Sequence, residues 1–572
     1  MRLMLGLFRW LVGALLRPFS ALMTRVKRRR TRGAPRWLLL PLEGRLSDLP
    51  PPSAPYFGVI RREKPLILIE IDEVLEAASR DPDIAGVICR LGELDAGWAG
   101  LWELREALRR FQSSGKQVKF YFDQASSRGY WLASCADEVL AAPQGTLNLL
   151  GLRAEVTFFR RLFDLAGVVP DFLRVGRYKS FAETFTEDEM TPAMNESLSA
   201  VLDDLSLLLV EGIASGRGLP GARVRELIDQ GPFTTGEAVG QGLIDAVCYP
   251  DELKERLEVG EQKPVFLSFG RYARRLFRQK WLNAPLRSRP QLAVVSAEGS
   301  IVDRAQGGLR RGGESIECRA YVRLLNALRE DPQVKGVVLR INSPGGSALA
   351  SDLLWRAVSR LQKEKPVVVS MGDTAASGGF YMAAPAGRIF ATPGTLTGSI
   401  GVVGGKFSIG PLYERLGIHK QAIERGRHSG IHASDRPFSE TERVRLQQAM
   451  DSHYRAFVDK VAEGRSLEPE QADAAAHGRV WSGRLGREIG LVDTLGGLRE
   501  AIEALRAEVK APRGLETVLL APRAGFGLSQ LWASAVMPAG LKELVLLVEK
   551  WSALAGSRGE MLTLLPYEID IR

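Results

Sequence analysis

One stretch of the chain combines a serine, two glycines and an expected change from strand to helix: Ser370–Tyr381, which reads SMGDTAASGGFY. The apolar run 366–369 comes before it and a helical pattern begins near Ser377, so the Ser377 hydroxyl is expected where a strand turns into a helix. A helix N-terminus offers unpaired N–H groups, and glycines let a substrate carbonyl approach the backbone. Ser377 is therefore a candidate nucleophile. The alternative is that it only caps the helix, because serine is a favoured N-cap residue.

Two other segments carry groups that would complete such a site. The segment 340–347 reads RINSPGGS, and its Gly345-Gly346 turn would present backbone N–H groups to an oxyanion. The segment 175–183 reads VGRYKSFAE and places Lys179 at the end of an expected strand. A lysine can take the proton of a serine only when it is neutral, which requires burial or nearby positive charge to lower its pKa from ~10.4.

The elements that must position these groups occur twice in the chain. When the sequence is shifted by 250 residues, DPDIAGVICR at 81–90 matches DPQVKGVVLR at 331–340, and GLID ending at Asp245 parallels GLVD ending at Asp493. The protein is therefore a tandem repeat of one domain. The 250-residue shift also aligns Asp123 with Asp373, Ser127 with Ser377, Pro143 with Pro393, Gly151 with Gly401, Gly167 with Gly417 and Gly176-Arg177 with Gly426-Arg427.

Each repeat alternates short apolar runs with helical patterns, beginning with PLILIEI at 65–71 in the first repeat and LAVVS at 292–296 in the second. This alternation predicts an α/β fold with parallel sheets, built from right-handed strand–helix–strand units. Longer helices are expected near 194–216 and 440–463.

The repeats differ at the positions that would do chemistry. The first repeat has Asp95 at the position of Gly345 in the glycine turn, and a carboxylate there would repel an oxyanion. It also has Ser127-Arg128 where the second repeat has Ser377-Gly378, whereas Lys179 of the first repeat corresponds to Ser429 of the second. One repeat has kept the serine and the other the base. The hypothesis is a split Ser–Lys dyad, buried at an interface between the two domains.

A histidine-based triad is the competing chemistry. No G-x-S-x-G motif surrounds Ser377, but His428 lies next to the position that corresponds to Lys179 and stays open as an alternative base. The histidines of the chain are His419, His428, His432, His453 and His477.

The composition, 45% hydrophobic and 25% charged over 572 residues, is that of a globular protein with more than one domain. The four cysteines show no spacing typical of a metal site or a disulfide framework, and they are interpreted as small buried residues. No metal or organic cofactor is expected. The cysteines are Cys89, Cys135, Cys248 and Cys318.

Residues 1–36 carry ten positive charges and no acid, which equals the net charge of +10, so the remaining chain is neutral. At about 100° per residue, Arg2, Arg9 and Arg17 fall on one face of an otherwise apolar helix. This pattern is typical of a helix that lies in a membrane surface, and the basic tract after it favours anionic lipid. The longest charge-free run is far shorter than the ~20 residues that span a bilayer. A nucleic-acid tail is disfavoured, because the apolar residues would have no role in it.

At this point the residues resemble a known family. The tandem repeats, the GDTAASGG and NSPGG motifs and the GRYKS motif are similar to those of the S49 serine proteases, in particular the long two-domain signal peptide peptidase A form. The resemblance covers about residues 55–510 and implies a ClpP/crotonase-like fold and cleavage of apolar peptides, such as leftover signal peptides, at a membrane. It also implies a homotetramer. The resemblance also implies a role for each site residue. Ser377 would be the nucleophile and Lys179 the general base. Gly346 and Gly378 would be the oxyanion donors with Gly345 as support, and Ser399 would orient the lysine.

The expected organisation is a basic membrane arm at 1–36, a first repeat at 55–256, a basic linker at 257–290, a second repeat at 291–512 and a helical tail at 513–572 with an amphipathic helix near 541–548. The expected location is the inner (plasma) membrane. The positive-inside rule favours a cytoplasmic body, whereas the family resemblance favours the other side, so the side stays open. Two rival functions remain: a crotonase-like acyl-CoA enzyme and a membrane scaffold without proteolytic activity.

Overall fold

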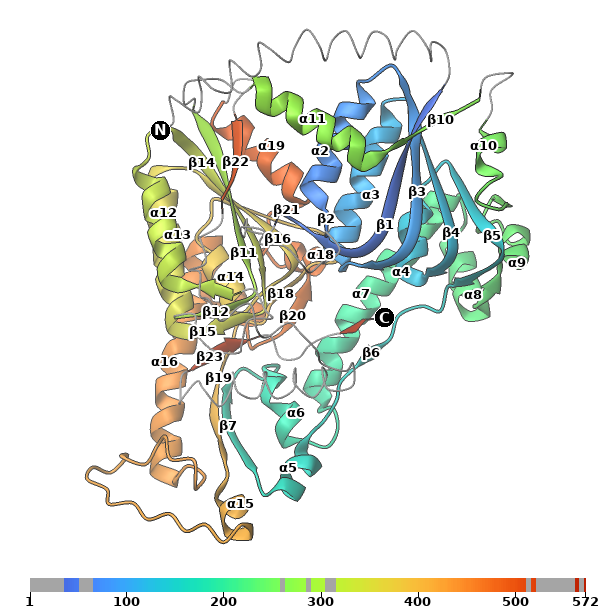
Figure 1. Ribbon diagram of the computed structural model, residues 1–572. Coiled ribbons are helices and arrows are strands. Elements are labelled where there is room, and N and C mark those ends of the chain that lie inside the picture. Colours follow the sequence, from blue (N-terminus) through green and yellow to red (C-terminus); the bar gives the residue numbers. More distant parts are fainter. Residues whose placement is uncertain are drawn as a thin grey trace. The chain divides into compact units, whose positions relative to one another are not determined.

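The computed structural model describes residues 35–50, 65–257, 263–283, 290–303, 315–510, 516–520, 561–564 and 570–571. The chain forms two compact units (Figure 1). The first contains residues up to Leu152 together with Ser206–Pro290, and the second contains Arg153–Leu205 together with Gln291–Ile571. The basic arm at 1–36 and the helix expected near 541–548 lie outside the described residues, apart from the last two residues of the arm.

The first unit is built on an eight-stranded sheet. Its main strand order is β10-β1-β3-β4-β5-β8, in which β8 alone along this path runs antiparallel to its neighbour. Its elements are β1 Arg36–Ser47, β2 Leu66–Ile67, α2 Leu68–Ser79, β3 Ile84–Asp95, α3 Trp98–Ser113, β4 Gln117–Ser126, α4 Ser127–Ala133, β5 Glu138–Asn148, α8 Gly221–Gln230, β8 Phe233–Thr234, α9 Thr235–Gly240, β9 Ala246–Val247, α10 Leu253–Arg256, β10 Val265–Ser268 and α11 Phe269–Asn283.

The second unit repeats this plan with the strand order β20-β18-β16-β14-β11-β22, and the side chains of Val337–Leu339 and Val367–Val369 are buried at its centre. Its first elements are β6 Ala154–Glu155, α5 Arg160–Ala166, β7 Val169–Val175, a 3₁₀ turn Ser180–Ala182 and α6 Glu183–Thr186, and α7 Pro192–Arg217 passes from this unit into the first. The others are β11 Gln291–Glu298, β12 Ser300–Val302, β13 Ser315–Glu317, α12 Cys318–Glu330, β14 Val334–Ser343, β15 Gly345–Ser347, α13 Ala348–Glu364, β16 Val367–Ala376, α14 Gly378–Ala383, β17 Arg388–Ala391, β18 Leu396–Gly398, β19 Val402–Ser408, α15 Gly410–Arg415, α16 Glu440–Arg465, α17 Pro469–Ala475, β20 Val480–Ser482, α18 Gly483–Glu488, β21 Thr494–Leu495, α19 Leu498–Glu508, β22 Glu516–Leu520, β23 Leu562–Leu564 and β24 Asp570–Ile571.

Matching glycines of the two repeats have nearly the same backbone φ. Gly167 and Gly417 have φ of 70° and 68°, and Gly176 and Gly426 have φ of 112° and 106°. These are left-handed values that residues with a Cβ adopt at a cost, so glycine is required at both members of each pair. The expected long helices appear as α7 and α16.

Two expectations differ from the structure. The run PLILIEI is not one strand: only Leu66–Ile67 pairs with β1, and helix α2 begins at Leu68. Its alternating apolar residues serve the helix instead, because Leu68, Ile71, Val74 and Leu75 line one buried face. The described parts of the expected helical tail are the short strands β22, β23 and β24.

The segment that carries Lys179 joins the second unit, although it belongs to the first repeat by sequence. Strand β7 pairs antiparallel with β19 over seven residues, from Val169 opposite Ser408 to Val175 opposite Val402. The expected interface between two domains is therefore the wrong setting for the dyad, because this ladder brings Lys179 inside the unit that holds Ser377.

No helix among the described residues is long and apolar enough to cross a membrane. All four cysteines are buried and unpaired.

Candidate active site

Ser377 stands at the junction of strand β16 and helix α14 in an unusual backbone conformation. Its φ is 55° and its ψ is −115°, and its N–H donates to the Gly398 carbonyl at 2.7 Å. A non-glycine residue in such a conformation costs on the order of 1–3 kcal/mol, and such residues cluster at functional sites. The side chain is buried and makes no capping hydrogen bond, so the interpretation of Ser377 as a simple N-cap is wrong.

Lys179 lies fully buried against this serine. Its Nζ is 2.8 Å from the Ser377 Oγ, 2.9 Å from the Ser399 carbonyl oxygen and 2.9 Å from the Ser399 Oγ. Burial lowers the pKa of Lys179 well below the ordinary value for a lysine. The structure therefore brings together three of the residues that sequence reasoning selected: Ser377, Lys179 and Ser399.

Three backbone hydrogen bonds hold the lysine and its serine partner in place. The His477 carbonyl accepts from the Tyr178 N–H at 2.8 Å, the Arg479 carbonyl accepts from the Ser399 N–H at 2.7 Å, and the Gly478 N–H donates to the Ile400 carbonyl at 2.7 Å. A Cβ on Gly478 would lie 2.6 Å from the backbone nitrogen of Lys179, so only glycine fits there.

Sequence reasoning missed this support at 477–479. A signal for it exists, because Gly231 precedes strand β8 in the first repeat as Gly478 precedes β20 in the second.

The glycine turn at the start of β15 is shaped by close backbone contacts. The Gly345 N–H donates to the Ser343 Oγ at 3.2 Å, so it supports the turn rather than pointing to a substrate. A Cβ on Gly346 would lie 2.0 Å from the Ile301 carbonyl oxygen, because β15 pairs there with β12. Gly378 lies buried in the first turn of α14, directly after the serine.

The sequence profile of Peptidase family S49 matches residues 110–263 and again 359–512, which together are more than half of the chain.

The chain belongs to peptidase family S49.

Individual relatives agree with this assignment. The S49 chain is 34% identical over 461 residues to the chloroplastic serine protease SPPA of Arabidopsis thaliana, a match that covers 80% of this chain and 68% of that protein. It is 31% identical over 447 residues to Protease 4 of Salmonella typhi, covering 76% of this chain and 71% of that protein. A ClpP1 mutant from Listeria monocytogenes matches 36% of this chain and 94% of its own chain at 16% identity, with a TM-score of 0.24.

The S49 chain is thus a serine protease with two tandem α/β repeats, as the motifs predicted. The relatives do not identify its catalytic residues, so those rest on the geometry. No histidine hydrogen-bonds to Ser377 in the described part of the chain, which contains all five. His428, the alternative base, lies in the turn after Gly426 that contains Ser429.

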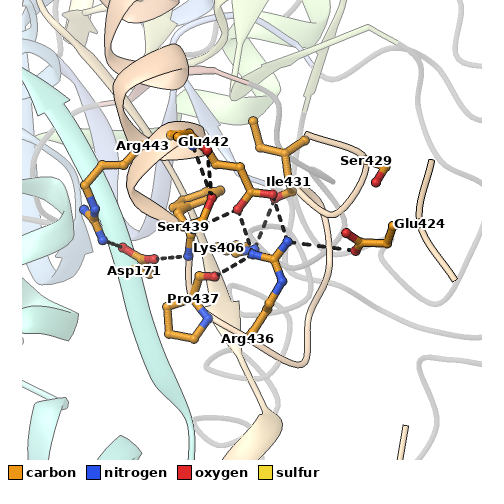
Figure 2. A network of polar contacts seen from close by, with 12 residues as sticks. Asp171, Lys406, Glu424, Ser429, Ile431, Arg436, Pro437, Ser439, Glu442 and Arg443 are labelled. Atoms are coloured by element: carbon orange, nitrogen blue, oxygen red, sulfur yellow. Dashed lines mark hydrogen bonds and ion pairs between the residues drawn. The ribbon is translucent and has the colours of Figure 1, made fainter. Parts of the chain in front are cut away.

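A polar network fastens the ribbon of β7 and β19 that leads to Lys179 (Figure 2). Asp171 of β7 is buried and accepts from the Phe438 N–H at 2.7 Å and from Arg443 at 2.6 Å. Next to it, the Glu442 carboxylate is bonded to Arg436 at 2.7 and 2.9 Å. The Arg436 guanidinium, with the Ser439 N–H, lowers the pKa of Glu442 to about 2. The strand is therefore tied to the start of α16.

Proposed function

We propose that this S49 protease cleaves peptide bonds with a Ser–Lys dyad in which Ser377 is the nucleophile and Lys179 the general base. The observation that carries the proposal is the 2.8 Å contact between Lys179 Nζ and Ser377 Oγ in a site where burial disfavours the charged amine. A lysine without its charge has a lone pair that can accept a proton.

The hydrogen-bond inventory around Lys179 fits a neutral amine. A neutral amine has two N–H donors and one lone pair. The Ser399 carbonyl and hydroxyl oxygens can accept the two donors, and the remaining neighbour, Ser377, can direct its O–H at the lone pair. Ser399 thus orients the lysine so that its lone pair faces the nucleophile.

The reaction is acyl transfer. Lys179 takes the proton of Ser377 as the oxygen attacks the peptide carbonyl, and the N–H groups of Gly346 and Gly378 stabilise the oxyanion. Lys179 then gives the proton to the leaving amine. Water, activated in the same way, releases the acyl group from Ser377.

Apolar peptides, such as cleaved signal peptides, are the proposed substrates. Helix α13 follows the glycine turn directly, and its first turns expose Leu349 (63%) and Leu353 (43%), four residues apart and hence on one face. Two exposed leucines next to the oxyanion turn would contact apolar substrate side chains.

The membrane surface is the proposed location, with anionic lipid bound by the basic residues of the arm at 1–36. Self-association into a tetramer is also proposed. Residues 419–425 correspond to β7 of the first repeat, yet they form no strand in the described chain, and Ile423 is 89% exposed there. A second copy could pair with this segment as β19 pairs with β7.

The test is hydrolysis of a fluorogenic apolar peptide by the purified protein and three variants. Ser377→Ala and Lys179→Ala should each abolish turnover while the circular dichroism spectrum stays that of the wild type. Ser127→Ala, at the matching position of the other repeat, should leave turnover unchanged. Full activity in Lys179→Ala would overturn the dyad.

A further inference from the structure

A strand from the far end of the chain occupies the sheet beside the proposed catalytic residues. The strand order β13-β12-β15-β23-β19-β7 places β23, Leu562–Leu564, between β15 and β19 (Figure 1). It runs antiparallel to both, with Leu564, Thr563 and Leu562 opposite Gly345, Gly346 and Ser347, and with Leu562 also opposite Val403. Among the described strands, β15 and β19 are joined through β23 alone.

The two strands that flank β23 contain or lie next to residues that we propose for catalysis. Strand β15 contains Gly346, the proposed oxyanion donor, and β19 begins three residues after Ser399, which holds the lysine. The next strand, β7, ends four residues before Lys179. An extended peptide laid between β15 and β19 therefore lies along the site, with backbone partners on both sides.

The hydrogen-bond pattern between the tail and β15 includes the position of Gly346, the proposed oxyanion donor. The Ala348 N–H donates to the Met561 carbonyl at 3.0 Å. Hydrogen-bonded and non-hydrogen-bonded pairs alternate along an antiparallel ladder, so the pair two residues on, Gly346 and Thr563, is expected to exchange hydrogen bonds as well. In that arrangement the Gly346 N–H faces a carbonyl of the chain's own tail.

A second, separate pairing holds the end of the tail. Strand β24 runs antiparallel to β6, with Asp570 opposite Glu155 and Ile571 opposite Ala154. The tail is thus attached on both sides of residues 565–569. Because the tail is part of the same chain, its effective concentration at the groove is on the order of millimolar, whereas a three-residue strand is weak enough to leave.

We propose that residues 561–564 are an intramolecular competitor that fills the peptide groove between β15 and β19 and leaves when a substrate strand replaces it. This proposal rests on the proposed function, since it takes the groove as the substrate site. A competitor of this kind raises the apparent KM without changing kcat, because it blocks binding and takes no part in chemistry.

The test uses the full chain and a fluorogenic apolar peptide. Thr563→Pro removes the N–H expected to reach the Gly346 carbonyl, and should lower KM about five- to tenfold with kcat unchanged. Thr563→Val keeps the N–H and is the matched control, with kinetics of the wild type. An unchanged KM in Thr563→Pro would overturn the proposal.

Adding the tail back separates competition from an indirect effect. A synthetic peptide that copies residues 559–569 should inhibit Thr563→Pro competitively, whereas the same peptide with proline in place of Thr563 should not. Inhibition that lowers kcat instead of raising KM would count against the proposal, and so would intact-mass evidence that the wild type cuts off its tail during the assay.

A binding measurement keeps this proposal distinct from the proposed function. In the Ser377→Ala background, a labelled apolar peptide should bind more tightly when Thr563→Pro is added, as read by fluorescence anisotropy. If no variant hydrolyses peptides but this difference in binding is present, the tail competes for the groove and the catalytic proposal alone fails.

Discussion

The two repeats place a serine at the same crossover from strand to helix and use it in opposite ways. In the second, Ser377 has a positive φ, caps nothing and contacts Lys179. In the first, Ser127 already belongs to helix α4, and its hydroxyl donates to the Asn148 carbonyl at 3.3 Å and accepts from the Leu150 N–H at 3.0 Å. A serine whose hydroxyl is engaged by backbone on both sides is structural. The comparison shows that the two copies share the residue type and differ in backbone strain and in hydrogen bonding.

The residue after each serine extends the contrast. Gly378 has no side chain and directly follows Ser377, whereas Arg128, at the matching position, directs its Nη1 to the Ala96 carbonyl at 3.2 Å. Ala96 corresponds in turn to Gly346 of the oxyanion turn. In the first repeat a guanidinium therefore reaches the turn that would bind an oxyanion in the second.

The largest expected effect comes from replacing Lys179, and the matched control replaces Ser429, its counterpart in the second repeat. Lys179→Met should lower kcat/KM by roughly 10⁴-fold, because no base remains, while Ser429→Ala should change nothing. In the wild type, kcat/KM should rise with pH through the lowered pKa of Lys179. Loss of activity in both variants would show that the counterpart is not inert.

The same substitution should raise stability. Burial lowers the pKa of Lys179 in the folded chain, so the unfolded chain binds more protons between that lowered pKa and the ordinary lysine pKa. Within this range the free energy of unfolding falls as pH falls and is recovered as pH rises. Lys179→Met should thus be the more stable protein by urea unfolding at pH 7, with a gap that narrows toward pH 10.5.

A smaller effect concerns the glycine turn. Gly346→Ala puts a Cβ 2.0 Å from the Ile301 carbonyl oxygen and should displace the proposed oxyanion donor, so kcat should fall about 10²- to 10³-fold. Ala96→Gly, its counterpart, should leave kcat unchanged. Thermal denaturation of both variants checks that the folds persist; a Gly346→Ala protein with wild-type kcat would remove Gly346 from the mechanism.

Ser399→Ala removes one of the two oxygens that hold the lysine and leaves the carbonyl. A single hydrogen bond of this kind corresponds to about a tenfold loss in kcat. Because an accepted hydrogen bond stabilises the ammonium form, its loss should move the acidic limb of the pH–rate profile to lower pH. An unshifted profile would indicate that Ser399 only packs against Lys179.

The smallest effect concerns the ion pair between Glu442 and Arg436 at the start of α16. Glu442→Gln should lower the free energy of unfolding by about 1–3 kcal/mol at pH 7, because the buried carboxylate loses its charge-assisted bonds to Arg436. With a folded pKa of about 2, the contribution of Glu442 is present above the usual glutamate pKa and is lost as pH falls toward 2. Acid titration of both proteins by circular dichroism should show the difference disappear.

The sequence predicted correctly those features that depend on local pattern. The 250-residue repeat, the strand and glycine turn before Ser377 and the long helices α7 and α16 are periodic or motif features, and they could be predicted from the chain alone. The run at 65–71 was misassigned, because alternating apolar residues fit a strand and a helix equally well over so short a length.

Composition, periodicity and the differences between the repeats determined the fold class, the duplication and the choice of Ser377 and Lys179. Tertiary structure alone decided that Lys179 enters the second unit, that the segment 477–479 fixes it there and that strand β23 lies between β15 and β19. The physical reason is that pairing between distant strands depends on which edges are left open. A sequence shows which segments can form strands, but only the folded chain shows which edge each one reaches.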